Sequence, residues 1–214
     1  MLYKISVFVL IGVFVFSMFY VFTGDKSAVS VTRLEVREDP LNNQGIIFSW
    51  DGSIDYPMAK DFSQAYKGLN SDILQIIIEL NSPGGSVEEG RRVIDIIKEM
   101  NQSYKVWTYV GPEKECLSMC VPIYIQGRVR IAAPDSIWLF HEAKAYDRFT
   151  DTEIMQYSHE KTKSDLVFFN RYLAHQDIDE AWLETIRDQV RVRDVWKTGQ
   201  QLTDERSGII TILE

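Results

Sequence analysis

The sequence predicts a single α/β domain with a mainly parallel sheet, preceded by an apolar N-terminal segment. Expected strands and helices alternate along the chain and are separated by short turns, which is typical of parallel α/β proteins. The apolar run Ile73–Leu80 is followed at once by a glycine turn and a helix. A chain of 214 residues, 45% hydrophobic and 25% charged, is long enough to bury a sizeable core.

The N-terminal segment Ile5–Thr23 carries no charge and is just long enough to cross a bilayer as a helix. A signal peptide is the alternative, but Val21–Asp25 offers no good small-x-small cleavage site, which favours an uncleaved anchor. Lys4 on the other flank then places the N-terminus in the cytoplasm. We therefore expect a single-pass protein of the plasma (inner) membrane, with its folded domain extracytoplasmic or periplasmic. The expected divisions are an anchor over 5–23, a stalk and first strand over 24–43, and the domain over 44–214.

Periodicity and turn residues predict the remaining elements in order. Strands are expected at Val31–Val36, Gly45–Ser49, Ile73–Leu80, Lys105–Val110, Val129–Ala132, Ile137–Phe140 and Ile209–Leu213, with a turn at Asn42–Gly45. Helices are expected at Pro57–Lys67, Ser86–Met100, Leu117–Ile125, Thr152–Leu173, Asp179–Gln189 and Thr198–Arg206.

Charge and cysteine usage exclude several functions. A net charge of −8 and the absence of a basic run argue against binding to nucleic acid. Cys116 and Cys120 lie at C-x-x-x-C spacing without a histidine pair at metal spacing, so neither a metal nor a cofactor is expected. An extracytoplasmic domain permits a disulfide between them, whereas i, i+4 geometry on one helical turn is poor for it. A disulfide and two buried thiols both remain open.

The glycine turn Asn81-Ser-Pro-Gly-Gly-Ser86 exposes backbone N–H groups at the end of a buried strand. Ser86 and Glu89 have the spacing of a capping box at the start of the next helix. Such a turn binds either a phosphate or the negative oxygen of an attacked carbonyl. No lysine follows in P-loop register, and Ser86–Gly90 is acidic, so the oxyanion interpretation is favoured.

Three residues at expected element ends are candidates for catalysis. Ser118, His141 and Asp194, each taken alone, are more typical of a helix cap, a structural histidine and a surface carboxylate. Together, in this order, they match the needs of acyl transfer: a nucleophile, its general base, and an acid that orients the base. The glycine turn adds one N–H to that of Met119 to complete an oxyanion hole.

Four stretches in order resemble the motifs of Clp-type serine proteases. They are Ile78–Ser86, Leu117-Ser-Met119, Ile137-Trp-Leu-Phe-His141 and Arg193-Asp-Val-Trp196. The resemblance implies a ClpP/crotonase-like β-β-α spiral, a peptide or protein substrate, and homo-oligomers assembled through the long helix after the histidine. It also implies that Ser118 is the nucleophile, His141 the base and Asp194 the acid, with Gly85 and Met119 as the oxyanion donors.

The sequence departs from the family at three places. Leu117 and Cys120 stand where small residues are usual, and Glu142–Asp147 replaces the glycine-rich segment that binds extended peptide. These departures motivate a first alternative, a non-catalytic scaffold of the same fold with a decayed site. A second alternative is a crotonase-type acyl-thioester enzyme, although coenzyme A is an improbable ligand outside the cytoplasm. No lysine in a matching context supports a Ser–Lys dyad.

Overall fold

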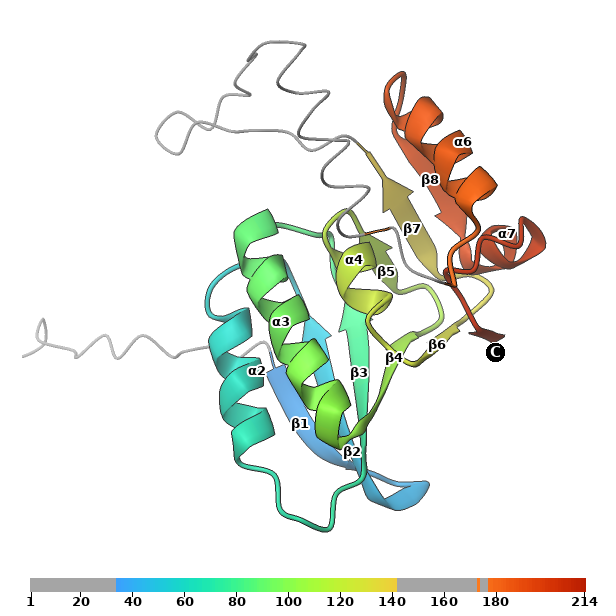
Figure 1. The fold of residues 1–214 in the computed structure, drawn as a ribbon. Coiled ribbons are helices and arrows are strands. Elements are labelled where there is room, and N and C mark those ends of the chain that lie inside the picture. The colour runs from blue at the N-terminus through green and yellow to red at the C-terminus, as the bar shows by residue number, and fades with distance from the viewer. Residues whose placement is uncertain (1–33, 142–172, 174–176) are drawn as a thin grey trace, which may run out of the picture. The chain divides into compact units, whose positions relative to one another are not determined.

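Six strands form the main sheet of this protein, in the order β1-β2-β3-β4-β6-β9 (Figure 1). The computed structural model describes residues 34–141, 173 and 177–214, all within one compact unit that spans residues 33–214. The strands are β1 (Leu34–Asp39), β2 (Asn42–Asp51), β3 (Gln75–Asn81), β4 (Lys105–Val110), β5 (Glu115–Leu117), β6 (Val129–Ala132), β7 (Ile137–Phe140), β8 (Val195–Thr198) and β9 (Ile212–Leu213). The helices are α2 (Met58–Lys67), α3 (Val87–Ser103), α4 (Cys120–Tyr124), α6 (Glu180–Val190) and α7 (Gly199–Asp204).

Parallel pairing dominates the six-stranded sheet, as predicted; only the edge pair β1–β2 is antiparallel. In β3 the residues Ile76, Ile78 and Leu80 are buried, while the positions between them are half-buried. The expected buried strand with one polar interruption is thus fully buried on one face only, and Glu79 on the other face forms an ion pair of 2.8 Å with Arg37 of β1. The inner face of the sheet therefore carries the core, and the helices cover it.

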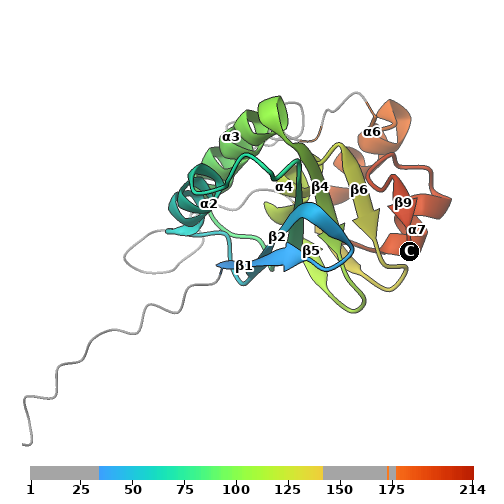
Figure 2. The same ribbon diagram turned by 90° about the horizontal axis from the view of Figure 1, so that it is seen from below.

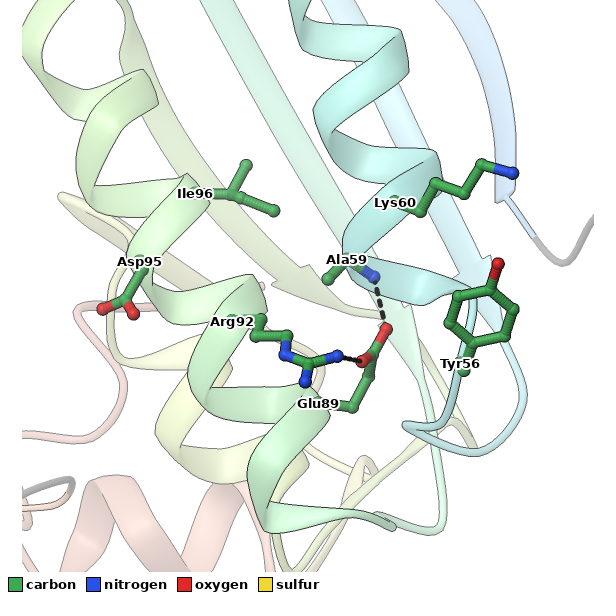
Figure 3. Close-up of a pocket in the computed structure, with 7 residues that line it drawn as sticks. All are labelled: Tyr56, Ala59, Lys60, Glu89, Arg92, Asp95 and Ile96. Atoms are coloured by element: carbon green, nitrogen blue, oxygen red, sulfur yellow. Dashed lines mark hydrogen bonds and ion pairs between the residues drawn. The ribbon is translucent and has the colours of Figure 1, made fainter.

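Helices α2 and α3 lie side by side on one face of the sheet (Figures 1 and 2). The Oγ of Ser86 caps α3 by accepting a hydrogen bond from the N–H of Glu89. The second half of the expected capping box is not formed, because the Glu89 carboxylate points to α2 instead. There it accepts a 2.8 Å hydrogen bond from the N–H of Ala59, in the first turn of that helix (Figure 3). The two helix N-termini are thus joined by one buried carboxylate.

Strands β5, β7 and β8 form a second, three-stranded sheet in the order β5-β7-β8. β5 and β7 run parallel, whereas β7 and β8 run antiparallel. A β-bridge between Ser82 and Cys116 joins the end of β3 to β5. This bridge fixes the position of the glycine turn relative to the second sheet.

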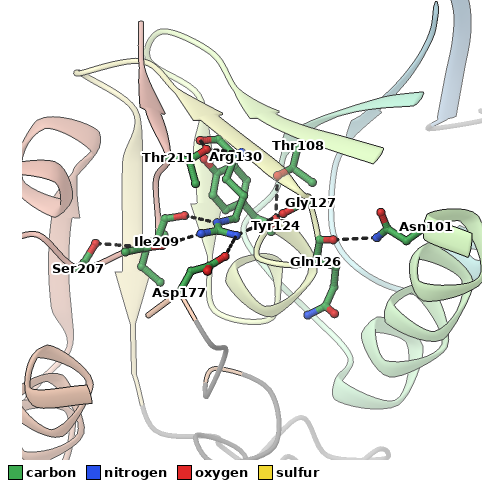
Figure 4. Close-up of polar contacts among 11 residues, drawn as sticks. Asn101, Thr108, Tyr124, Gln126, Gly127, Arg130, Asp177, Ser207, Ile209 and Thr211 are labelled. Carbon is green, nitrogen blue, oxygen red and sulfur yellow. Dashed lines mark hydrogen bonds and ion pairs between the residues drawn. The ribbon is translucent and has the colours of Figure 1, made fainter. Parts of the chain in front are cut away.

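Arg130 ties the C-terminal segment to the main sheet (Figure 4). Its side chain is fully buried and donates to the carbonyls of Ile209 at 2.8 Å, Gly208 at 2.9 Å and Gly127 at 3.3 Å. It also forms an ion pair of 3.2 Å with Asp177. A buried guanidinium is tolerated because its donors are met by acceptors.

Several expected boundaries need correction. The first turn lies at Pro40–Leu41 rather than Asn42–Gly45, because Asn42 already pairs with Asp39 at the start of β2. The helix expected at Leu117–Ile125 is shorter: Glu115–Leu117 is a strand, and Pro122 lies in the first turn of α4, as expected. The terminal strand is only Ile212–Leu213. Strand β8 has no counterpart among the expected elements.

Two expected helices fall outside the described residues. They are the anchor over Ile5–Thr23 and, apart from Leu173, the long helix over Thr152–Leu173. Within the described part of the chain, no helix combines the length and apolarity that crossing a membrane requires.

Candidate active site

The second sheet brings the three candidate residues to one edge. Ser118 directly follows β5 and His141 directly follows β7. These strands are parallel, so their carboxyl ends meet at the same edge of the sheet. Asp194 directly precedes β8, which runs antiparallel to β7 and therefore starts at that edge. Three residues from distant parts of the sequence are thus gathered by strand pairing alone.

The register across β7 and β8 relates His141 to Asp194. Phe140 pairs with Val195, so the next residue on each side, His141 and Asp194, stand opposite each other as the ladder ends. Directly opposed residues of an antiparallel pair have Cβ atoms about 5 Å apart. His141 is half-buried and Asp194 is exposed. A carboxylate at this position can orient an imidazole, although water reaches it more readily than it reaches a buried carboxylate.

Ser118 occupies a sharp turn between β5 and α4. Its φ is +53°, in the left-handed region, which costs a non-glycine residue about 1–2 kcal/mol. Its N–H donates to the carbonyl of Leu139 on β7 at 2.9 Å, and its carbonyl accepts from Val121 at 3.1 Å. In α/β-hydrolases, a strained strand-to-helix turn presents a nucleophilic serine at the top of a sheet. Ser118 itself is half-buried.

The glycine turn packs directly against Ser118. Gly84 has φ +91°, and a Cβ built on it would lie 2.7 Å from both the Ser118 Cβ and the Leu117 carbonyl oxygen. Ser82 fixes this approach, because its N–H donates to the Glu115 carbonyl at 2.7 Å and its carbonyl accepts from the Leu117 N–H at 2.9 Å. Only glycine fits at position 84, because the backbone there packs directly against the turn that holds Ser118.

The two expected oxyanion donors are the N–H groups of Gly85 and Met119. Gly85 has φ +150° and forms a bridge with Ile54 through its neighbours, Gly84 and Ser86. Among the hydrogen bonds of the described residues, neither the Gly85 N–H nor the Met119 N–H is a donor. Uncommitted N–H groups beside a serine are what a developing oxyanion requires.

Cys116 and Cys120 form a disulfide across the Ser118 turn. The expectation of poor geometry assumed that both residues lie on one helix. Instead, Cys116 lies in β5 and Cys120 begins α4, and the left-handed Ser118 between them brings the sulfurs together. The structure therefore decides between the disulfide and the buried thiols in favour of the disulfide.

Sequence reasoning missed one contributor to this site and left a second one open. Ser82 lies inside the glycine motif, but nothing in its spacing indicates the bridge to Cys116. The disulfide was left open, although two cysteines placed symmetrically about a candidate nucleophile are a signal.

A cavity of about 400 Å³ between α2 and α3 is lined by Tyr56, Glu89 and Arg92 among others, and by none of the candidate site residues (Figure 3). In the described ranges no cluster of His, Cys, Asp and Glu suits a metal ion.

Comparisons with known proteins agree with this architecture. Residues 35–205 match the sequence model of a family described as Clp protease. Among solved structures, a ClpP1 mutant from Listeria monocytogenes is similar, with a TM-score of 0.60 and 22% sequence identity. That match covers 78% of this chain and 90% of the other, and it bears on the fold alone. The comparison with curated proteins gave no match.

Proposed function

Because this chain belongs to the Clp protease family and is a serine-type peptidase, we propose that it cleaves peptide bonds at Ser118, His141 and Asp194. Membership of the family implies protein substrates and an oligomeric assembly. The observation that carries the proposal is the strand register, in which the ends of β5 and β7 and the start of β8 share one edge.

In this proposal the Ser118 hydroxyl attacks the scissile carbonyl while His141 accepts its proton. The oxygen of the tetrahedral intermediate accepts hydrogen bonds from the N–H groups of Gly85 and Met119. His141 then returns the proton to the leaving amine, and water hydrolyses the acyl-enzyme by the same steps. A general base of this kind contributes about 10²–10⁴-fold to the rate, and one oxyanion donor about 10²–10³-fold.

Asp194 orients the imidazole and stabilises its charged form. Its position opposite His141 supports this role. The exposure of Asp194 weakens its electrostatic stabilisation of the charged imidazole, because water screens a charge pair at the surface. We therefore assign most of the catalytic effect to the serine, the histidine and the two N–H groups.

Labelling with a fluorophosphonate probe tests the peptidase site. Wild-type protein should be labelled and should cleave an unstructured protein, and Ser118→Ala should abolish both activities. Ser103→Ala, at the exposed end of α3, is the matched control and should be labelled normally. A folded wild type that is never labelled and cleaves nothing would instead favour a non-catalytic scaffold of the same fold.

We further propose that Ile5–Thr23 anchors the peptidase in the plasma (inner) membrane, with the domain on the extracytoplasmic side. The uncharged apolar segment supports the anchor. The Cys116–Cys120 disulfide supports the compartment, because disulfides persist in oxidising environments. The full chain should resist carbonate extraction from membranes and be digested by protease added to spheroplasts. Deletion of residues 5–23 should release it, and a domain protected in spheroplasts would contradict the orientation.

A further inference from the structure

The Cys116–Cys120 disulfide closes a loop that contains only Leu117, Ser118 and Met119. Both cysteines are fully buried. The loop therefore holds the proposed nucleophile and one proposed oxyanion donor, and nothing else. These are the only two cysteines among the 214 residues, so any thiol-dependent behaviour of the chain originates here.

One end of the bridge is held firmly by the sheet. Cys116 lies opposite Trp138 in the β5–β7 register and opposite Ser82 across the bridge to β3. Strand partners on both sides thus fix its position. The Sγ of Cys116 is a rigid anchor from which the other half of the loop can be positioned.

The other end depends more on the bridge. Helix α4 has only five residues, and its N-cap, Met119, receives no side-chain capping bond. A helix this short does not set its own first turn. Ser118, just before it, is in the left-handed region, which a serine adopts only when its surroundings impose it. The disulfide is the covalent constraint that spans this weak part.

We infer that the Cys116–Cys120 disulfide is a positioning element for catalysis, which holds the Ser118 hydroxyl and the Met119 N–H in reactive geometry. The inference rests on the proposed peptidase function. Reduction by a dithiol breaks the Sγ–Sγ bond, leaves one thiol on each cysteine, and converts the dithiol to its own disulfide. The buried side chains of α4 keep the helix in place, while the three-residue turn relaxes. The peptidase is therefore active in its oxidised form and weakened by thiols.

The test compares the oxidised full-length chain with full-length chain that has been reduced by a dithiol in denaturant, because the bond is fully buried, and refolded with the dithiol present. The acylation rate with a fluorophosphonate should fall by about 10- to 100-fold on reduction, because displacement of reacting groups by about 1 Å costs this much. The apparent affinity for the probe should change little, since the loop positions reacting atoms rather than binding the substrate. Hydrogen exchange of the 117–121 amides should rise in the reduced form, and the near-ultraviolet circular dichroism should stay native.

Two variants complete the design. Cys116→Ser with Cys120→Ser should acylate as slowly as reduced wild type and should not respond to dithiol. Ile76→Val, at a fully buried position near the start of β3 and six residues before Ser82, loses stability without loosening the loop and should keep the wild-type rate. This control separates a positioning effect from general destabilisation.

Each outcome decides the inference. Equal acylation rates in folded oxidised and reduced protein would overturn it, as would unchanged exchange at 117–121. If both the reduced chain and the double variant unfold, the disulfide serves the fold rather than positioning, and the inference fails. If neither form is labelled while exchange still rises on reduction, the peptidase proposal is the part that fails.

Discussion

The carboxylate of Glu89 on α3 accepts a 2.8 Å hydrogen bond from the backbone N–H of Ala59 in α2 (Figure 3). Glu89 is only 4% exposed, although glutamate is rarely buried without partners. Its second oxygen lies 3.4 Å from Arg92 on the next turn of α3. One side chain thus satisfies an N–H at the start of a neighbouring helix, where negative charge is also favoured by the helix dipole.

Glu89→Ala should lower the free energy of unfolding by about 1–3 kcal/mol, because it leaves the Ala59 N–H buried and unpaired. Glu89→Gln keeps an oxygen acceptor and should lose less. Glu88→Ala is the matched control, since Glu88 forms only an exposed pair with Arg92, and it should stay within about 0.5 kcal/mol of wild type. Urea unfolding measures all three, and equal losses for Glu89→Ala and Glu88→Ala would contradict the assignment.

Gly84→Ala should reduce acylation of Ser118 by about 100-fold or more, because the new Cβ would meet the Ser118 Cβ at 2.7 Å. The measurement is the rate of labelling by a fluorophosphonate, with circular dichroism to check folding. Gly68→Ala provides the control: its Cβ would lie at least 3.4 Å from its neighbours, and its φ is −86°. Normal labelling of Gly84→Ala would show that the glycine turn does not contact the reactive serine.

Asp194→Asn should lower kcat for peptide cleavage by roughly 10-fold or more with little change in KM, because the amide orients the imidazole poorly. Because Asp194 is exposed, Asp194→Asn should lose less activity than Ser118→Ala. Asp188→Asn changes the net charge equally at an exposed ion pair on α6 and should leave kcat unaltered. A loss shared by both variants would point to the surface charge rather than to His141.

Glu205 should make the protein lose stability in acid. Burial alone would raise the pKa of this carboxyl, but hydrogen bonds from Lys197 and Trp182 outweigh it and lower the pKa below the usual 4.5. As the pH falls below about 4.5, the unfolded chain takes up this proton first, so stability declines until the folded pKa is passed. The unfolding free energy of Glu205→Gln should therefore depend less on pH in this window. Glu184→Gln, exposed on α6, should behave like wild type.

Tyr124 should make the protein lose stability as the pH rises into the alkaline range. Burial raises the pKa of its phenol well above 10, although the Arg130 charge lowers it in part. Above about pH 10 only the unfolded chain ionises readily, so stability falls as the pH rises. Among the described residues its hydroxyl has no hydrogen-bond partner. Tyr124→Phe should thus keep or slightly raise stability at neutral pH and lessen the alkaline loss, whereas Tyr56→Phe, at an exposed ring, should not.

The sequence predicted those elements whose cause is local. Lys105–Val110, Val129–Ala132 and Ile137–Phe140 form strands at the expected residues, because alternation and flanking turns suffice to define them. The Ser86 cap is equally local. The Glu89 half of the capping box was wrong, because an N–H on another helix competes for that carboxylate and no pattern within α3 reveals it.

In the candidate site, too, the features with a local cause were predictable and those with a tertiary cause were not. The types and order of the site residues were readable, whereas β5 and β8 were not, because β5 has only three residues and only the first two residues of β8 are apolar. These two strands exist through pairing with β7, a tertiary effect. The sequence left the disulfide open for a related reason: its geometry depends on the backbone reversal at Ser118, and a serine in the sequence does not indicate a left-handed conformation.

The hydrogen bonds of Arg130 to Gly208 and Ile209 affect how the chain can fold during its synthesis. Nearly 80 residues separate this arginine from those carbonyls. Until residues 208–213 have been synthesised, β6 has no β9 beside it and the guanidinium lacks two acceptors. The main sheet therefore closes only after this segment has left the ribosome. A nascent chain that stalls before Gly208 would keep the Asp177 ion pair of Arg130 but leave two donors of a buried guanidinium unpaired, and quality-control proteases would find it easy to unfold.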